Sequence, residues 1–136
     1  MDKSLQTLKS LMDEYINYSM AIAGAVVLGG IVFVINFPHG IILASVAASK
    51  QAVYTFFAGG LIARNGENLA LRWDSRWLSL LVSIVVSTVI AVGLTFLVHS
   101  LRGTPEPLQS TIPTIILSPI GFFIIAWRRQ QQSLAE

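Results

Sequence analysis

The sequence contains no cysteine. A chain without cysteine has no disulfide framework, no thiolate metal site and no cysteine nucleophile. Charge is scarce too, because Asp, Glu, Lys and Arg make up only 12% of the 136 residues. A soluble domain carries about 25% charged residues. The shortage excludes a disordered chain, a nucleic-acid binder and most soluble enzymes, and it favours a chain that uses lipid as part of its solvent.

Hydrophobic residues are abundant and occur in long runs. They make up 54% of the chain, and about twenty consecutive apolar residues span a bilayer core. Residues 18–37, 77–98 and 108–127 are such runs without a single charge. Each of the three predicts a transmembrane helix.

A fourth apolar stretch, over residues 41–72, is interrupted by Lys50 and admits two interpretations. In the first, a helix runs over 41–64, ends with Gly66 as its C-cap, and carries Lys50 near the middle of the bilayer. In the second, residues 41–49 lie at the outer surface and the span begins at Lys50, which snorkels outward. We favour 41–64, because it needs no additional interfacial helix.

Residues 4–16 precede these runs and have a different pattern. Leu5, Leu8 and Met12 recur at helical spacing, while Lys9 and Asp13 fall mainly on the other side. This pattern predicts a short amphipathic helix, lying in the membrane interface or docked on a protein partner. The predicted fold is therefore an all-α integral membrane protein, a single membrane domain over 1–136 with four transmembrane helices in a small bundle after one amphipathic helix.

The basic residues predict an orientation. With four spans both termini share one side, and seven of the nine Lys and Arg residues fall there: Lys3, Lys9, Arg64, Arg72, Arg76, Arg128 and Arg129. Arg102, in a predicted tight loop after the third span, lies on the opposite side. Since positive residues are retained on the cytoplasmic side, both termini are predicted to be cytoplasmic, and the expected location is a bacterial inner (plasma) membrane.

Lys50 is the centre of the first candidate site. An ionisable residue at mid-membrane depth costs about 2.5–3.5 kcal/mol on insertion scales and is a functional candidate by default. Gln51, Tyr54 and Thr55 lie within one helical turn of it. No predicted span supplies a carboxylate. We therefore expect these four residues to contact a ligand or a partner chain, unless Lys50 simply lies at the outer interface.

The third span carries a stripe of small residues at every fourth position, namely Ser79, Ser83, Ser87, Ala91 and Thr95. Small residues at this spacing let helix backbones approach closely, and their hydroxyl groups bond across the contact. The stripe predicts helix packing, or alternatively a polar track along a pore. Ala21, Ala25 and Gly29 of the first span form the face expected to pack against it. The glycine pairs at 29–30 and 59–60 are explained by close packing or by a flexible point.

Basic and aromatic residues around the second loop suggest a lipid headgroup site. It comprises Arg64, Arg72, Arg76, Trp73 and Trp77. Basic clusters at a cytoplasmic surface attract anionic headgroups, and tryptophan prefers the membrane interface. A plain ion pair of Glu67 with Arg64 is the alternative.

No enzyme template is present: the sequence has no nucleophile elbow, zinc-protease helix, phosphate-binding loop or dinucleotide fingerprint. We expect no catalytic residue, no metal site and no cofactor. Size and span count invite comparison with the small multidrug-resistance transporters, but those depend on a glutamate in the first span, and residues 18–37 contain no acid.

The expected function is that of a small non-catalytic membrane protein. It is an accessory or assembly subunit of a membrane complex that acts through helix–helix and lipid contacts, as a homo-oligomer or in a heteromeric complex. The alternative is a small channel or transporter, formed by a homo-oligomer with a polar path around Lys50, Gln51 and Tyr54.

Overall fold

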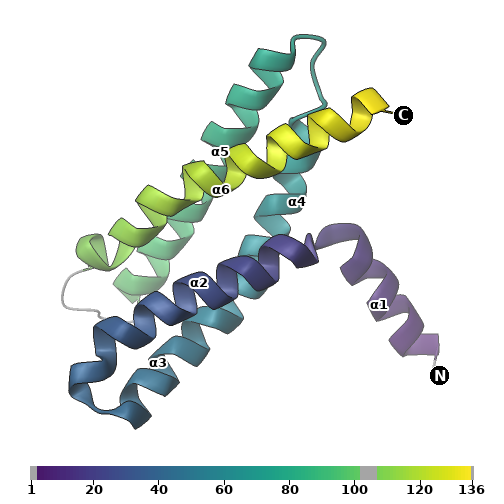
Figure 1. Ribbon diagram of the computed structural model, residues 1–136. Coiled ribbons are helices and arrows are strands. Elements are labelled where there is room, and N and C mark those ends of the chain that lie inside the picture. Colours follow the sequence, from purple (N-terminus) through teal and green to yellow (C-terminus); the bar gives the residue numbers. More distant parts are fainter. Residues whose placement is uncertain (1–2, 102–106, 136) are drawn as a thin grey trace. The chain divides into compact units, whose positions relative to one another are not determined.

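The computed structural model describes residues 3–101 and 107–135. Within these ranges every regular element is a helix (Figure 1). Four helices are long and apolar enough to cross a membrane, and a short helix precedes them, which confirms the predicted fold class. The chain forms two compact units, Met1–Arg64 (unit 1) and Asn65–Glu136 (unit 2), and each is described by itself. The single domain over 1–136 stays a prediction.

Unit 1 begins with α1 (Lys3–Tyr15) and continues into α2 (Tyr18–Asn36). Asn17 caps α2, because its side-chain oxygen accepts a hydrogen bond from the Met20 N–H at 3.1 Å. This cap satisfies one of the free N–H groups at the start of a helix. After α2, a 3₁₀ turn, η1 (Phe37–His39), leads to Gly40, whose φ of +103° favours glycine. The chain therefore reverses here, as the Pro-His-Gly sequence indicates.

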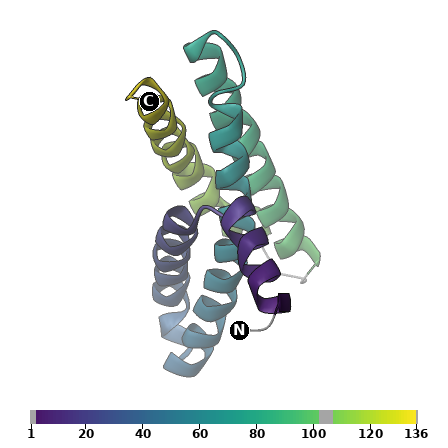
Figure 2. The same cartoon turned by 90° about the vertical axis from the view of Figure 1, so that its right-hand side faces the viewer.

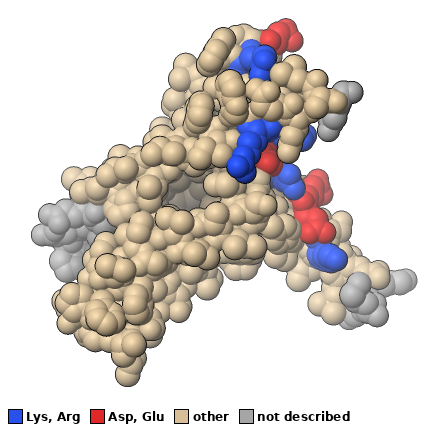
Figure 3. Space-filling model, viewed as in Figure 1, with Lys and Arg blue, Asp and Glu red and all other residues tan. Residues whose placement is uncertain are grey.

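The second half of unit 1 is a helix that changes its geometry midway. It starts as α3 (Ile41–Tyr54), widens into a π-helical segment, η2 (Thr55–Gly59), and continues as α4 (Gly60–Leu69). α2 and α3 lie side by side in both ribbon views (Figure 1 and Figure 2). The turn that joins α2 to α3 and the exposed side of α2 carry no charged residue on the face shown in Figure 3.

Small residues set the contact between α2 and α3. A Cβ placed on Gly29 would lie 3.2 Å from the Ala52 Cβ, and one on Gly24 would lie 3.0 Å from the Thr55 Cγ2. The two backbones thus approach as closely as glycine permits. Within unit 1, Gly29 of the face that was expected to pack against the third span thus lies against the second span.

The π-helical segment keeps the small residues on this face. Gly60 lies five residues after Thr55, and a Cβ on Gly60 would come within 2.6 Å of the Ile16 Cγ2. In an α-helix the residue four positions after Thr55 would lie on the same face. In a π-turn it is the residue five positions after Thr55 that lies on this face. The Gly60 carbonyl accepts the Asn17 N–H at 3.1 Å, so the turn between α1 and α2 is fastened to the start of α4.

Unit 2 consists of the end of α4 with α5 (Arg76–Leu101) and α6 (Pro107–Ala135). Its hydrophobic core consists of Ala70, which follows α4, Leu80 of α5 and Ala126 of α6, with Ile84 packed against them. The loop predicted to follow the third span, with Arg102, lies largely outside the described residues.

Two helix ends differ from the sequence prediction. Gly66 is not a C-cap: the helix passes through it to Leu69, and Gly40 is the glycine with a positive φ among the described residues. Gly66 instead lies against α5, where its missing side chain permits a close approach. α6 continues beyond Trp127 to Ala135, because Arg, Gln and Leu are good helix formers even outside the apolar run.

Candidate functional site

The residues of the Lys50 cluster lie on different faces of the helix formed by α3 and η2. Gln51 and Thr55 come together, since Gln51 Nε2 donates to Thr55 Oγ1 at 3.0 Å and Thr55 is buried. Lys50 is exposed. On a helix with about 100° per residue, position 50 lies about 160° from Ala52, which faces α2. The Lys50 ammonium group therefore points away from α2.

The serine stripe of α5 is buried, with Ser79, Ser83, Ser87 and Thr95 all exposed by 5% or less and Ala91 half-buried. Ser83 Oγ donates to the Gly66 carbonyl at 2.7 Å. A Cβ on Gly66 would lie 2.9 Å from Ser87 Oγ. Ser83 and Ser87 of the stripe thus contact α4, and a hydrogen bond is built into this contact.

The loop between α4 and α5 is held by side chains from two helices. Ser79 Oγ accepts the Trp73 N–H and donates to the Trp73 carbonyl, both at 3.0 Å. Gln130 of α6 donates to the Ala70 carbonyl and to the Arg76 carbonyl, both at 2.9 Å. Because only the amide nitrogen can donate to two carbonyls, the orientation of the Gln130 side chain is fixed. Gln130 therefore fastens both ends of this loop to α6.

Gln130 was not among the predicted site residues, although the sequence contains a signal for it. Phe122 and Ala126 are buried on α6, and the same four-residue step reaches Gln130, which is only 4% exposed. This signal is weak because Gln130 is the first of three consecutive glutamines beyond the apolar segment. Their identical side chains give no reason to single out one of them.

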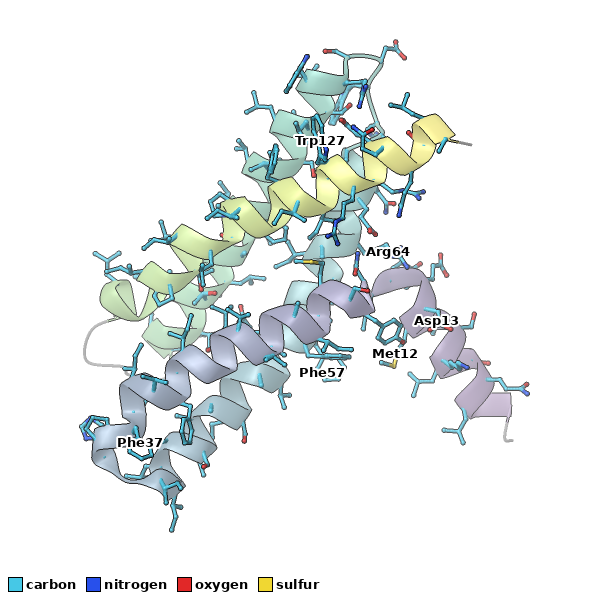
Figure 4. The ribbon with its side chains drawn as sticks, viewed as in Figure 1. Met12, Asp13, Phe37, Phe57, Arg64 and Trp127 are labelled. Carbon is cyan, nitrogen blue, oxygen red and sulfur yellow. The ribbon has the colours of Figure 1, made fainter. Side chains whose placement is uncertain are left out.

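The predicted headgroup residues belong to both units. Arg64 belongs to unit 1, where its Nη2 donates to the Asp13 carbonyl at 2.7 Å, and Figure 4 shows both residues near the end of α1. This carbonyl is one of the last four of α1, which lack partners within the helix. A guanidinium here also interacts favourably with the negative end of the helix dipole. Arg64 thus fastens α1 to the beginning of α4.

Arg76 and Trp77 gather with residues of α6 around a small open pocket of about 130 Å³. Its lining consists of Arg76, Trp77, Trp127, Gln130 and Gln131. The Trp77 and Trp127 rings lie 6.5 Å apart, and Trp127, marked in Figure 4, stacks at 6.0 Å on Phe123. Arg72 and Trp73 are exposed but do not line the pocket. We call the pocket lined by Arg76, Trp77, Trp127, Gln130 and Gln131 the tryptophan pocket.

Among the described residues no group of three or more His, Asp or Glu side chains could hold a metal ion. The two candidate sites are Lys50 on an apolar helix face and the tryptophan pocket beside a loop that carries Arg72. On four apolar helices, these features define an integral membrane protein of the all-α class. No known protein-family model, curated protein or solved structure matches the chain.

Proposed function

We propose that the protein is a non-catalytic accessory or assembly subunit of a membrane complex. It acts through a contact between Lys50 and a helix of a partner chain. It also acts through lipid contacts at the membrane edge where the tryptophans lie. The proposed location is a bacterial inner membrane with both termini in the cytoplasm, supported by the positions of seven of the nine basic residues in the sequence.

The observation that carries the proposal is the outward position of Lys50. Between Tyr18 and Ala63 the sequence has no other Asp, Glu, Lys or Arg. The residues that share the Lys50 face, Leu43, Val46 and Val53, are apolar and exposed. A helix face that is otherwise suited to lipid thus carries one full positive charge.

The depth of Lys50 decides whether lipid alone could accommodate it. Lys50 lies nine residues after the start of α3, which corresponds to about 14 Å along the helix axis. With α3 entering the hydrocarbon near Ile41, that depth is close to the middle of a core about 30 Å thick. A lysine there is stabilised by an opposite charge or by hydrogen-bond acceptors. A carboxylate or a polar group on a partner helix is the chemistry that meets this need.

The amphipathic helix α1 supports the lipid part of the proposal. Leu5, Leu8, Leu11 and Tyr15 are all about half exposed, so α1 leaves much of its apolar face uncovered by the described residues of unit 1. An apolar face of this kind is suited to the boundary between headgroups and acyl chains.

The test is native mass spectrometry of the protein extracted from its own membrane in lipid nanodiscs. We expect a stoichiometric complex with wild type and with Lys50→Arg, which keeps the charge, and its loss with Lys50→Leu. Ser49→Leu, a change at the exposed neighbouring position, is the matched control and keeps the complex. A monomer for wild type and all variants would contradict the proposal.

The alternative function is a channel or transporter formed by a homo-oligomer. Because Lys50 points away from α2, the path would run outside the α2–α3 contact, and the proposed path lies between copies of the chain. In that case proteoliposomes show ion or solute flux that Lys50→Ala and Gln51→Ala alter, whereas an accessory subunit gives the flux of empty liposomes.

A further inference from the structure

The tryptophan pocket combines three kinds of recognition within unit 2. Arg76 and Trp77 come from the first turn of α5, and Trp127, Gln130 and Gln131 come from the last part of α6. With a volume of about 130 Å³, the pocket is smaller than the roughly 300–1,000 Å³ of sites that enclose a drug-sized ligand. It fits a small polar group whose remainder lies outside.

Hydrogen bonding within the fold limits what Gln130 can offer this group. A primary amide has two N–H hydrogens and one oxygen. The carbonyls of Ala70 and Arg76 use both hydrogens. Oε1, an acceptor, is therefore the polar side-chain atom that Gln130 has left for a ligand, and it suits a donor on that ligand.

The aromatic rings favour a cation. Trp127 is held by its stacking on Phe123, and Trp77 lies at an interplanar angle of 45° to it with 74% of its surface exposed. Tryptophan is the side chain that attracts cations most strongly to its face. Arg76, in contrast, is an exposed donor that suits phosphate oxygens. One wall of the pocket thus suits a positive group and another a negative group.

We propose that the tryptophan pocket binds the headgroup of a zwitterionic phospholipid that carries a primary ammonium, of the ethanolamine type. The phosphate lies at Arg76, and the ammonium lies against the tryptophan rings and donates to Gln130 Oε1. A choline headgroup is cationic but has no N–H to donate, and a glycerol headgroup has no cation. The lipid's acyl chains remain outside, along the apolar surface of α5 and α6. This inference specifies the lipid part of the proposed function.

The experiment measures which lipids remain bound. The purified protein is placed in nanodiscs of phosphatidylethanolamine and phosphatidylglycerol in equal amounts, and native mass spectrometry counts the lipids retained after release. We expect wild type to retain phosphatidylethanolamine preferentially. Trp77→Leu and Arg76→Gln should each reduce this retention about two- to fivefold, as expected for one exposed cation–π contact or charged hydrogen bond. Neither side chain takes part in the loop contacts of Gln130, so both variants are expected to fold.

Two controls test the pocket itself. Trp73→Leu and Arg128→Gln remove the same side-chain types outside the pocket, and an equal loss there would overturn the proposal in favour of general interfacial attraction. Replacing phosphatidylethanolamine by phosphatidylcholine should also lower retention. Equal retention of both lipids would overturn the role of Gln130, and displacement of lipid by soluble phosphoethanolamine would show a site for a free metabolite instead.

The proposed lipid site and the proposed Lys50 contact can be refuted independently of each other. Lys50→Leu should leave lipid retention unchanged, and Trp77→Leu should leave the complex intact. A protein that keeps its partner but shows no lipid preference would overturn the inference alone. A protein with the lipid preference but no partner would overturn the proposed subunit function alone.

Discussion

Replacing Gln130 by leucine should destabilise the protein more than any conservative change at its neighbours. Gln130 is 4% exposed and donates two hydrogen bonds of 2.9 Å, to Ala70 and to Arg76. Leucine has a similar size but no donor. The Ala70 carbonyl, which belongs to a residue only 1% exposed, would lose its side-chain partner in a buried position. The bond to the Arg76 carbonyl is only partly buried, so water can replace the lost donor there.

The magnitude follows from these two environments. Leaving a buried acceptor unsatisfied costs about 1–3 kcal/mol, and an ordinary hydrogen bond contributes about 1 kcal/mol. The expected loss of unfolding free energy for Gln130→Leu is therefore about 2–4 kcal/mol. Gln130→Glu should lose at least as much at neutral pH, because an ionised carboxylate has no donor and would face two carbonyl oxygens.

The assay is equilibrium unfolding by SDS in mixed micelles, followed by circular dichroism. Gln131→Leu is the matched control, since Gln131 is adjacent, exposed and makes neither of these bonds. Amide hydrogen exchange should show faster opening over residues 70–75 in Gln130→Leu than in the control. If the two leucine variants unfold within about 0.5 kcal/mol of each other, a spread typical of surface changes, the argument for a loop clamp is refuted.

Two other contacts give comparable tests. Gly66→Ala should destabilise the protein by about 1–3 kcal/mol in the same assay, because its Cβ would lie 2.9 Å from Ser87 Oγ. Adding Ser87→Ala should restore much of the lost stability. Gly30→Ala is the control and should not destabilise the protein, because its Cβ would meet nothing within 4 Å. Equal effects of Gly66→Ala and Gly30→Ala would contradict a close contact at Gly66. Arg64→Gln should speed exchange of the last amides of α1 about fivefold, since a hydrogen bond of about 1 kcal/mol to the Asp13 carbonyl is weakened; unchanged exchange there would show that α1 does not depend on Arg64.

The α4–α5 region shows why the sequence locates helices better than contacts. Gly66, followed by polar residues, has the pattern of a helix end. In the structure Gly66 lies inside α4, and its missing side chain makes room for Ser83 and Ser87 of α5. The stripe of α5 predicts that some helix comes near, but not which one. The partner depends on the path of the chain between the helices, which periodicity does not encode.

The residues of the predicted headgroup site also have neighbours that the sequence does not indicate. Arg64 and Arg76 look equivalent in sequence, as basic residues at one membrane edge. The structure gives Arg64 a carbonyl of α1 and places Arg76 beside Trp127, which is fifty-one residues away. Only the crossing of α5 with α6 brings that tryptophan and Gln130 to the loop.

The sequence by itself determined that this chain is four apolar helices with one charge that does not suit lipid. In a bilayer, unpaired backbone groups are so costly that an apolar run of twenty residues has helix as its available form. The tertiary structure decided which residues meet: Gln130 with the loop, Gly66 with the serines, and Gly60 with Ile16 through the π-turn. It also turned Lys50 away from α2. These outcomes depend on distances of a few tenths of an ångström between helix backbones, which composition and spacing leave open.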